Sequence, residues 1–470
     1  MRPIELILNL LTFLSAILLL LPRVSAKLKY RVAPLLLSLT AAVQILFEGV
    51  RWQLWPLMIA ISLLLLTAGI RSTQQTKPKP TAIALFSLIL AILSLAGGWL
   101  LPIPKPYPTT GPYEVGTTVF PLVDTSRKEL YATDPDQPRE IMVQVWYPVD
   151  LEEGALRAQW MPDIAVAGPA IAEWVDLPSF ALNHLKYAKV NAYLDVPIAS
   201  DGEKFPLLIF SHGWSGFKEQ NIYQVEELAS HGYVVVGISH TYGAVLTVFP
   251  DGREIPRNDD ALPSGVSQEV YDRASNQLVR QWAGDIGFVL DEFSRRDQAG
   301  DWLIADRLDL SKVGVFGHST GGGATAEFCS ADSRCDAALM MDLWVEPVSD
   351  EIVAAGLTQP TLLMHSADWV DLDNPSRNFL RIRELVEASS GEVTEFRIKG
   401  TEHYDFTSVP LFTPLANAIG LKGPIPGNSG LELINFYTVA FYDQYLRGDD
   451  QGLLLSENSQ FDVAQFIQQP

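Results

Sequence analysis

Cysteine is nearly absent from this chain, whose 470 residues contain only Cys329 and Cys335. Their spacing matches neither the CxxC pattern of a redox motif nor the ligand pattern of a four-ligand zinc site. We therefore expect no metal site and no dithiol chemistry built on cysteine. Two interpretations of the pair stay open, a short local disulfide and two free thiols, and an oxidising compartment permits the first.

Basic residues are also scarce. The chain has 34 Lys and Arg against 55 Asp and Glu, which gives a formal net charge of −21. The imbalance is uneven, because residues 1–101 hold nine basic and two acidic residues while the remainder holds 25 and 53. So acidic a region repels phosphate backbones, and no basic stretch with interleaved aromatic residues offsets the repulsion. We expect no nucleic-acid partner.

Long apolar runs dominate the first hundred residues, each close to the ~20 residues that cross a bilayer core. They are Ile4–Leu21, Val32–Phe47, Leu54–Ile70 and Thr81–Leu101. Charges are concentrated in the connections and amphipathic periodicity is missing, which argues against soluble helices, and the three later runs argue against a cleaved signal peptide. We expect about four transmembrane helices. The second run contains Pro34 and Gln44, so a tilted or re-entrant segment is the alternative there.

The connections between the runs differ in their basic residues. The first holds Arg23, Lys27, Lys29 and Arg31, the third holds Arg71, Lys77 and Lys79, and the second holds Arg51 beside Glu48. Because Lys and Arg favour cytoplasmic loops, the first and third connections are expected in the cytoplasm. The chain is then a multi-pass integral membrane protein whose acidic remainder is extracytoplasmic. If the second run does not span the membrane, the acidic remainder is expected on the opposite side.

The prolines between Pro102 and Pro108 end the fourth run and favour an extended linker. We expect a transmembrane region over 1–101, a linker over 102–112 and one α/β domain over 113–470. In that domain apolar strands alternate with helices, which is typical of a mainly parallel sheet covered on both faces. The expected strands are 141–147, 206–211, 233–239, 312–316, 337–341, 360–365 and 394–398, the helices 219–230, 267–295, 322–329, 376–388 and 431–446, and the loops 151–200 and 241–266.

The most specific motif is Gly-His-Ser-Thr-Gly at 317–321, between an expected strand and an expected helix. Gly-x-Ser-x-Gly in this context is a nucleophile elbow, in which small residues flank a serine on a strained turn. The turn exposes the hydroxyl at a helix N-terminus, where the dipole and free N–H groups favour a developing oxyanion. The motif predicts the α/β-hydrolase fold with Ser319 as nucleophile, and a glycine-rich structural turn is the alternative.

A serine nucleophile needs an imidazole base held by a carboxylate, and in this fold the acid and then the histidine follow the serine. Two histidines come after Ser319. His365 ends an apolar run, as a half-buried strand residue does, whereas His403 lies in a loop beyond a strand and is the predicted base. Spacing does not decide among the candidate acids between the two residues, which include Asp342, Asp368, Asp371 and Asp373.

An oxyanion site is predicted from a second strand, 207–211, which ends in His212-Gly213-Trp214. Such a loop supplies one backbone N–H, and the residue after the nucleophile supplies the other. Trp214 and Thr320 are therefore the expected donors, while His212 is expected only to shape the turn.

Together these residues resemble the platelet-activating-factor acetylhydrolase family, the calcium-independent group also called lipoprotein-associated phospholipase A2. The resemblance spans about residues 110–447, with its strongest pieces at 210–213, 317–319, 338–344 and 400–403, and 139–148 is similar to the family's early strand. In that family the acid stands in Asp-x-Trp, which implies Asp342, with Asp368 the runner-up. The family uses no metal, and we expect no cofactor. Its vertebrate enzymes lack a multi-span anchor, and Trp214 and Thr320 depart from its usual residues, so the acyl pocket is expected to differ.

The expected activity is hydrolysis of a carboxylic ester through an acyl-Ser319 intermediate, with His403 first taking the serine proton and later activating water. The resemblance implies short or oxidised acyl chains on phospholipids, so the expected partner is a lipid or small ester. Acyl transfer, general carboxylester or polyester hydrolysis, and a non-catalytic membrane-anchored binding module remain alternatives. The sequence carries no signal for an oligomeric state.

Overall fold

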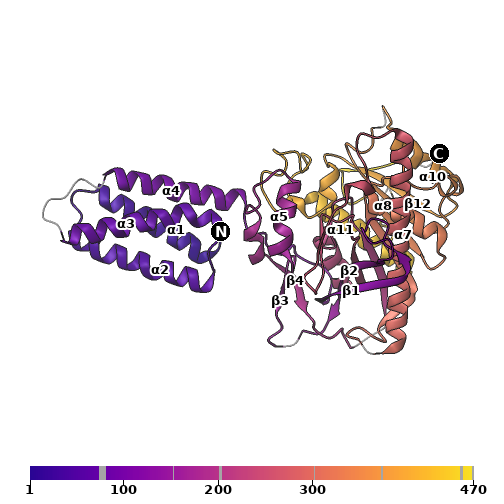
Figure 1. Cartoon of the computed structure of the whole chain (residues 1–470), viewed down its shortest axis with the longest axis horizontal. Helices are drawn as coiled ribbons and strands as arrows, with labels where there is room; N and C mark the ends of the chain where they lie inside the picture. The colour runs from indigo at the N-terminus through magenta and orange to yellow at the C-terminus, as the bar shows by residue number, and fades with distance from the viewer. Residues whose placement is uncertain are drawn as a thin grey trace.

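The computed structural model describes residues 1–73, 81–151, 153–200, 204–300, 302–371, 374–455 and 459–467. Within them the N-terminal part is a bundle of four helices that projects from the rest of the molecule (Figure 1). These are α1 (Pro3–Leu20), α2 (Ala33–Phe47), α3 (Trp55–Thr73) and α4 (Thr81–Leu100). All four are long and apolar enough to cross a membrane by length and composition, the second when counted from Leu28. Many large apolar side chains of these helices are exposed, among them Leu10, Leu46 and Phe86.

Glu5 is a charge inside the first apolar run rather than in a connection. Its carboxylate is fully buried and accepts hydrogen bonds from Arg51 Nε and Nη2 at 3.0 and 2.9 Å. Arg51 also donates to the carbonyl of Leu101 at 3.3 Å. Glu5 lies in the first turn of α1, and the N-terminus lies at the end of the bundle that faces the rest of the molecule (Figure 1). A charge near a helix end is tolerated because its partner satisfies it there.

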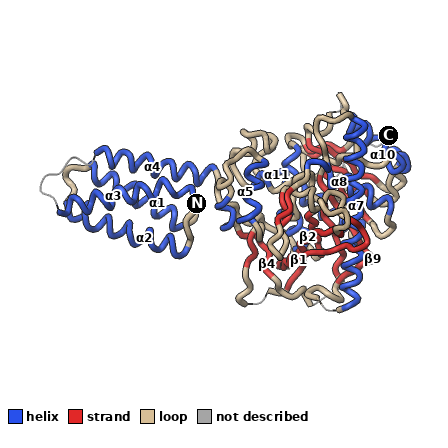
Figure 2. The backbone as a smooth tube through the Cα atoms, in the orientation of Figure 1, coloured by secondary structure: helices blue, strands red, loops and turns tan. Residues whose placement is uncertain are grey.

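The remainder is built on a sheet that has eleven strands within the described residues, in the order β13-β12-β11-β10-β9-β5-β6-β2-β1-β4-β3. The six neighbouring strands from β12 to β6 are parallel, while β2 and β13 join them antiparallel. Strands lie at the centre with helices around them (Figure 2). The central strands are β5 (Phe205–Ser211), β6 (Val234–Ser239), β9 (Leu308–His318), β10 (Ala337–Met341), β11 (Thr361–Ser366) and β12 (Val393–Ile398).

Alternate residues of these strands face two separate cores. Leu207 and Ile209 pack with α7 (Gln268–Ala299), α8 (Thr320–Ala331) and α10 (Arg377–Ala388) on one side. Leu208 and Phe210 pack with α6 (Ile222–Ser230) and α11 (Ser429–Tyr442) on the other. Because both faces are covered, the strands read as continuous apolar runs. This is the predicted α/β-hydrolase fold.

The expected strands and helices are all present, within a few residues at their ends, with the first strand as β2 (Pro138–Val149). The prediction of loops over 151–200 and 241–266 is wrong in part. The first segment contains β3 (Arg157–Gln159), α5 (Ile164–Trp174) and β4 (Lys189–Leu194), and the second contains β7 (Leu246–Val248) and β8 (Glu254–Pro256). Three further elements were not expected, namely β1 (Glu114–Lys128), α9 (Asp350–Ala355) and β13 (Ala464–Phe466). Gly116, Pro121 and scattered polar residues conceal β1, which is held by its long antiparallel pairing with β2.

Candidate active site

Ser319 stands alone between a strand and a helix, because β9 ends at His318 and α8 begins at Thr320. Its backbone is in a left-handed region, with φ 55° and ψ −116°, and its N–H donates to the carbonyl of Met341 at 2.9 Å. The flanking glycines permit this turn. A Cβ at Gly317 would lie 2.2 Å from the carbonyl oxygen of Gly321, and one at Gly321 would lie 2.0 Å from that of Ser211. The Gly-x-Ser-x-Gly spacing is thus a steric requirement of this elbow.

His403 and Asp342 meet beside this turn, although 61 residues separate them in the chain. His403 follows β12, Asp342 follows β10, and the distance from His403 Nδ1 to Asp342 Oδ2 is 2.9 Å. The buried carboxylate also accepts from the N–H and hydroxyl of Ser366 at 2.6 and 2.5 Å. With Nδ1–H donating to Asp342, Nε2 is the nitrogen left to act as a base. The imidazole of His403 stacks on Trp369, with ring centroids 4.4 Å apart.

His318 braces this arrangement from the other side. Its Nε2 lies 3.1 Å from the carbonyl oxygen of His403, and its Nδ1 lies 3.2 Å from Gln220 Nε2. Nδ1 therefore accepts from the amide and Nε2–H donates to the carbonyl. Burial, and then the neighbouring His403, hold the pKa of His318 well below its usual value, so the ring is neutral. The sequence analysis gave His318 no role, since it was simply one variable position of the motif.

His318, Asp342 and His403 could between them offer three ligand atoms to a metal ion, all within 4.8 Å of one another. Most of these atoms are already engaged, because Asp342 bonds His403 Nδ1 and both nitrogens of His318 have partners. A structural metal site instead points several free lone pairs at one position. The arrangement fits a triad better than a metal centre.

The other candidate side chains lie elsewhere. His365 is fully buried on β11, with Nε2 3.1 Å from Glu395 Oε1. Asp368 and Asp371 follow the same strand and are exposed, and Asp371 accepts from the N–H of Asn374 at 3.2 Å. Asp373 lies outside the described residues. Of the candidate acids in the described part, the structure brings Asp342 to His403.

The two expected oxyanion donors lie on either side of Ser319. Thr320 is the first residue of α8, where a backbone N–H has no acceptor within the helix. Gly213 lies directly against the nucleophile, because a Cβ there would be 3.3 Å from Ser319 Cβ. Trp214 follows Gly213 and lines the same cavity as Ser319.

That cavity has a volume of about 270 Å³ and also exposes His403. Its walls are mostly apolar and aromatic, from Trp174, Phe217, Tyr404, Val409 and Phe412, with Arg257 as a charged member. Sequence reasoning missed these wall residues. Trp174 and Arg257 come from the two segments expected to be irregular loops, and the aromatic residues within such loops were the available signal.

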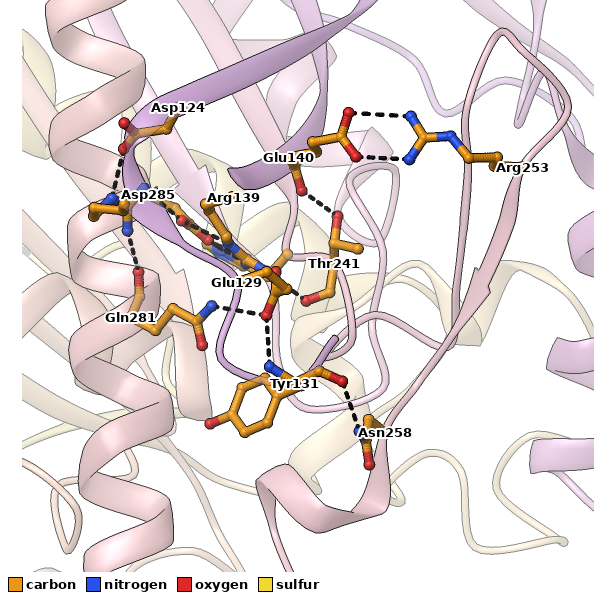
Figure 3. A network of polar contacts seen from close by, with 12 residues as sticks. Asp124, Glu129, Tyr131, Arg139, Glu140, Thr241, Arg253, Asn258, Gln281 and Asp285 are labelled. Atoms are coloured by element: carbon orange, nitrogen blue, oxygen red, sulfur yellow. Dashed lines mark hydrogen bonds and ion pairs between the residues drawn. The ribbon is translucent and has the colours of Figure 1, made fainter. Parts of the chain in front are cut away.

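A buried polar cluster lies beyond the active-site cavity, at the end of β6. Arg139 Nε and Nη2 donate to Asp285 at 3.0 and 2.6 Å, and Nη1 donates to Glu129 and to the carbonyl of Thr241. Figure 3 shows Arg139 among Asp285, Glu129 and Thr241. Asp285 Oδ2 also lies 2.9 Å from His240 Nδ1, and His240 Nε2 lies 2.9 Å from Ser211 Oγ. No part of the sequence analysis anticipated this cluster.

Cys329 at the end of α8 and Cys335 before β10 are joined by a disulfide with Cα atoms 5.1 Å apart. Both sulfur-bearing residues are buried in the core beside α7. The bond ties the helix that begins at the elbow to the strand that leads to Asp342.

The chain is similar to a known protein family over most of its length. The family described as "Platelet-activating factor acetylhydrolase, isoform II" matches residues 104–284 and 299–463. A platelet-activating factor acetylhydrolase of Cavia porcellus is 26% identical over 388 residues, covering 73% of this chain and 81% of its own length, and one of Gallus gallus is 28% identical over 275 residues, covering 52% and 63%.

A probable 1-alkyl-2-acetylglycerophosphocholine esterase of Arthroderma benhamiae is 25% identical, covering 80% of this chain and 95% of its own length. Among solved structures, a ferulic acid esterase of Streptomyces cinnamoneus superposes with a TM-score of 0.62 at 24% identity, covering 78% of this chain and all of its own. That likeness shows the fold. The chain therefore belongs to the platelet-activating factor acetylhydrolase, isoform II, family of serine ester hydrolases, as its sequence motifs indicated.

Proposed function

We propose that this ester hydrolase works through an acyl intermediate on Ser319, with His403 as the base and Asp342 as the acid. The observation that carries the proposal is the convergence on one cavity of a strained serine elbow and a histidine whose Nδ1 lies 2.9 Å from a buried carboxylate. Two backbone N–H groups beside the serine, at Trp214 and Thr320, complete the set that acyl transfer to serine needs.

In the first half of the reaction, Ser319 Oγ attacks the ester carbonyl carbon and His403 Nε2 takes its proton. The carbonyl oxygen becomes an oxyanion that accepts hydrogen bonds from the two backbone N–H groups. The intermediate then collapses to the acyl-serine, and the alkoxy group takes the proton from His403 Nε2 and leaves as the alcohol. In the second half, His403 removes a proton from water, the hydroxide attacks the acyl carbon, and Ser319 recovers its proton as the carboxylic acid departs.

The support around Asp342 suits this role. Ser366 contributes two donors that carry no charge, and these two hydrogen bonds fix the orientation of the carboxylate. A buried, ionised acid favours the imidazolium that forms when His403 takes the proton. The ring stacking on Trp369 holds the imidazole plane during both half-reactions.

The substrate class we propose is a phospholipid or related lipid ester with a short acyl chain. The volume of about 270 Å³ is at the lower end of small-molecule sites, and the walls are apolar. The name of the Arthroderma benhamiae relative refers to the ester of a 1-alkyl-2-acetylglycerophosphocholine. The cavity is also close to the apolar helices. Thr413 Oγ1 donates to the carbonyl of Leu100, the last residue of α4, at 2.7 Å, and the preceding residue, Phe412, lines the cavity.

We propose further that the four apolar helices anchor the chain in a membrane, with the hydrolase part on the extracytoplasmic side. The bundle and the hydrolase part are in contact, since Trp52 Nε1 donates to the carbonyl of Ala181 at 3.0 Å and the Trp52 ring packs on Phe180. The cysteine pair is compatible with an oxidising location. The boundaries proposed for the three parts are 1–101, 102–112 and 113–470.

The test uses the full chain in detergent and a fluorophosphonate probe, with Ser319→Ala as the control. We expect the label on Ser319, and hydrolysis that is fastest with acetyl esters in a panel of p-nitrophenyl and 2-acyl phospholipid esters. An unlabelled Ser319 would favour a non-catalytic binding module. A new ester in place of free acid, when an alcohol is added, would favour acyl transfer.

A further inference from the structure

His212 directly follows β5 and stands two residues before the proposed oxyanion donor Trp214. Its side chain is fully buried, and both ring nitrogens are engaged. Nε2 accepts from the backbone N–H of His240 at 3.2 Å, and Nδ1 lies 2.7 Å from the carbonyl oxygen of Gly213. Since Nε2 accepts, the proton is on Nδ1, which donates to that carbonyl. Burial, and then the neighbouring His240, hold the pKa of His212 well below its usual value, so this neutral tautomer persists.

The carbonyl that His212 holds belongs to the same peptide group as the N–H of Trp214. The described residues contain no cis peptide bonds, and in a planar trans peptide the C=O and N–H point in opposite directions. Gly213 O also accepts from the N–H of Gly216 at 2.9 Å, so two donors hold it on one side. The Trp214 N–H is thereby held on the opposite side of the peptide plane.

This peptide needs a lock because of the glycine before it. A Cβ at position 213 would lie 3.1 Å from His318 Nδ1 and 3.3 Å from Ser319 Cβ, so close approach to the nucleophile requires glycine. Glycine also removes the steric barrier that keeps other residues in one backbone conformation. A half-turn of the Gly213–Trp214 peptide would replace the N–H beside the nucleophile with a carbonyl oxygen, which repels an oxyanion.

We propose that His212 is a positioning residue that locks the Gly213–Trp214 peptide, so that the Trp214 N–H is preformed for the oxyanion. The inference rests on the proposed acyl-serine function. His212 does not carry protons in the reaction, because its acceptor nitrogen is occupied and the ring is buried. It acts through the backbone, and only the Trp214 N–H touches the reacting group.

The lock is itself anchored. The backbone N–H that fixes His212 belongs to His240, whose ring stacks on Trp282 with centroids 4.2 Å apart and an interplanar angle of 6°. His240 Nδ1 lies 2.9 Å from Asp285, which is part of the cluster that Arg139 organises (Figure 3). The orientation of one oxyanion donor is thus connected to the rigid interior of the fold.

Two substitutions distinguish the hydrogen bond from His212 to the Gly213 carbonyl from the packing of the His212 side chain. His212→Asn places an amide donor where Nδ1 was and keeps the bond to Gly213 O, whereas His212→Gln reaches the His240 N–H instead and loses that bond. We expect His212→Asn to retain kcat within about fivefold, and His212→Gln to lose on the order of 100-fold in kcat with KM changed less than about threefold. A trifluoromethyl ketone, which forms a hemiketal oxyanion on the serine, should bind His212→Gln more weakly by a similar factor.

His184→Gln is the matched control. His184 is also a buried neutral histidine whose Nδ1 bonds a backbone carbonyl, that of Ala181 at 3.0 Å, and burial lowers its pKa to about 4. It should lose thermal stability without losing kcat. Equal kcat in His212→Asn and His212→Gln, or losses that only follow their unfolding temperatures, would overturn the lock. Failure of the wild-type chain to take the fluorophosphonate label would instead overturn the proposed function, so the two failures are distinguishable.

Discussion

Two serine–histidine–aspartate arrangements occur in this molecule, and their comparison shows what makes one of them an active-site candidate. Ser211, His240 and Asp285 are joined by contacts of 2.9 and 2.9 Å, yet all three side chains are fully buried and none of them lines the cavity that holds Ser319. His403 is 22% exposed at its side chain and shares a cavity with Ser319. Residue types and hydrogen bonds alone therefore do not define a catalytic triad. Access for a substrate separates the two.

The two aspartates also differ in what competes for their charge. Burial would raise the pKa of Asp285, but Arg139, His240 and Arg127 hold it well below its usual value. That charge is shared with two arginines, and burial lowers the pKa of His240, so an imidazolium is disfavoured there. In the described part of the chain, Asp342 accepts from the neutral N–H and hydroxyl of Ser366 and contacts His403. We therefore propose that Asp342 stabilises a protonated histidine and that Asp285 stabilises the fold.

The largest difference between the two arrangements should appear in their serines. Ser319→Ala removes the nucleophile, so we expect kcat to fall on the order of 10⁶-fold, as when a triad serine is lost elsewhere. Steady-state hydrolysis of a p-nitrophenyl ester, with an unfolding curve as the control for folding, measures it. Turnover within tenfold of wild type would remove Ser319 from the mechanism.

The acids give the next largest contrast. Asp342→Asn should leave His403 in the wrong tautomer and lower kcat on the order of 10⁴-fold, while Asp368→Asn, at an exposed position, stays within about tenfold. Both variants should show near-normal thermal unfolding before their kinetics are compared. The opposite result, with Asp368→Asn inactive, would assign the acid to the position after β11 and contradict the proposed triad.

Some features of the fold and of the site could be predicted from the sequence alone, and others could not. The parallel strands and the elbow were predictable, because apolar runs and Gly-x-Ser-x-Gly are local patterns. The choice of acid was not settled by spacing, since Asp342, Asp368 and Asp371 all follow strands and only burial and contact with His403 distinguish them. The family resemblance supplied Asp342.

Long-range arrangements were the main omission. Ser211 and His240 are 29 residues apart and His240 and Asp285 are 45 apart, so nothing local indicates that they meet. The cavity walls were missed for the same reason, because Trp174 and Phe412 reach the site from segments without a regular hydrophobic period. Side chains that depend on tertiary packing leave only weak signals in one sequence.

Stability should distinguish Asp285 from Asp342. Asp285→Asn leaves the buried Arg139 with a weakened partner, so we expect the free energy of unfolding to fall by about 3 kcal/mol at neutral pH. Because the folded pKa of Asp285 is depressed, its contribution is present above the unfolded value near 3.8 and is lost as pH falls below it. The gap between wild type and variant should therefore narrow from about pH 7 to about pH 3 in denaturant unfolding. A gap that stays constant would contradict the charge-based role.

The smallest effect is expected at Ser211, and it is the sharpest test of the comparison. Ser211 Oγ lies 2.9 Å from His240 Nε2, which is the contact a nucleophile would make with its base, and its side chain is completely buried. If it only contributes a neutral hydrogen bond, Ser211→Ala should cost about 1 kcal/mol in unfolding free energy and leave kcat within about threefold of wild type. A much larger cost in kcat at unchanged stability would mean that the second arrangement takes part in the chemistry. The same kinetic assay used for Ser319→Ala, with the active concentration of Ser211→Ala set by its fluorophosphonate labelling, compares the two serines directly. A buried serine cannot exchange its proton with a substrate that never reaches it, whatever its hydrogen bonds.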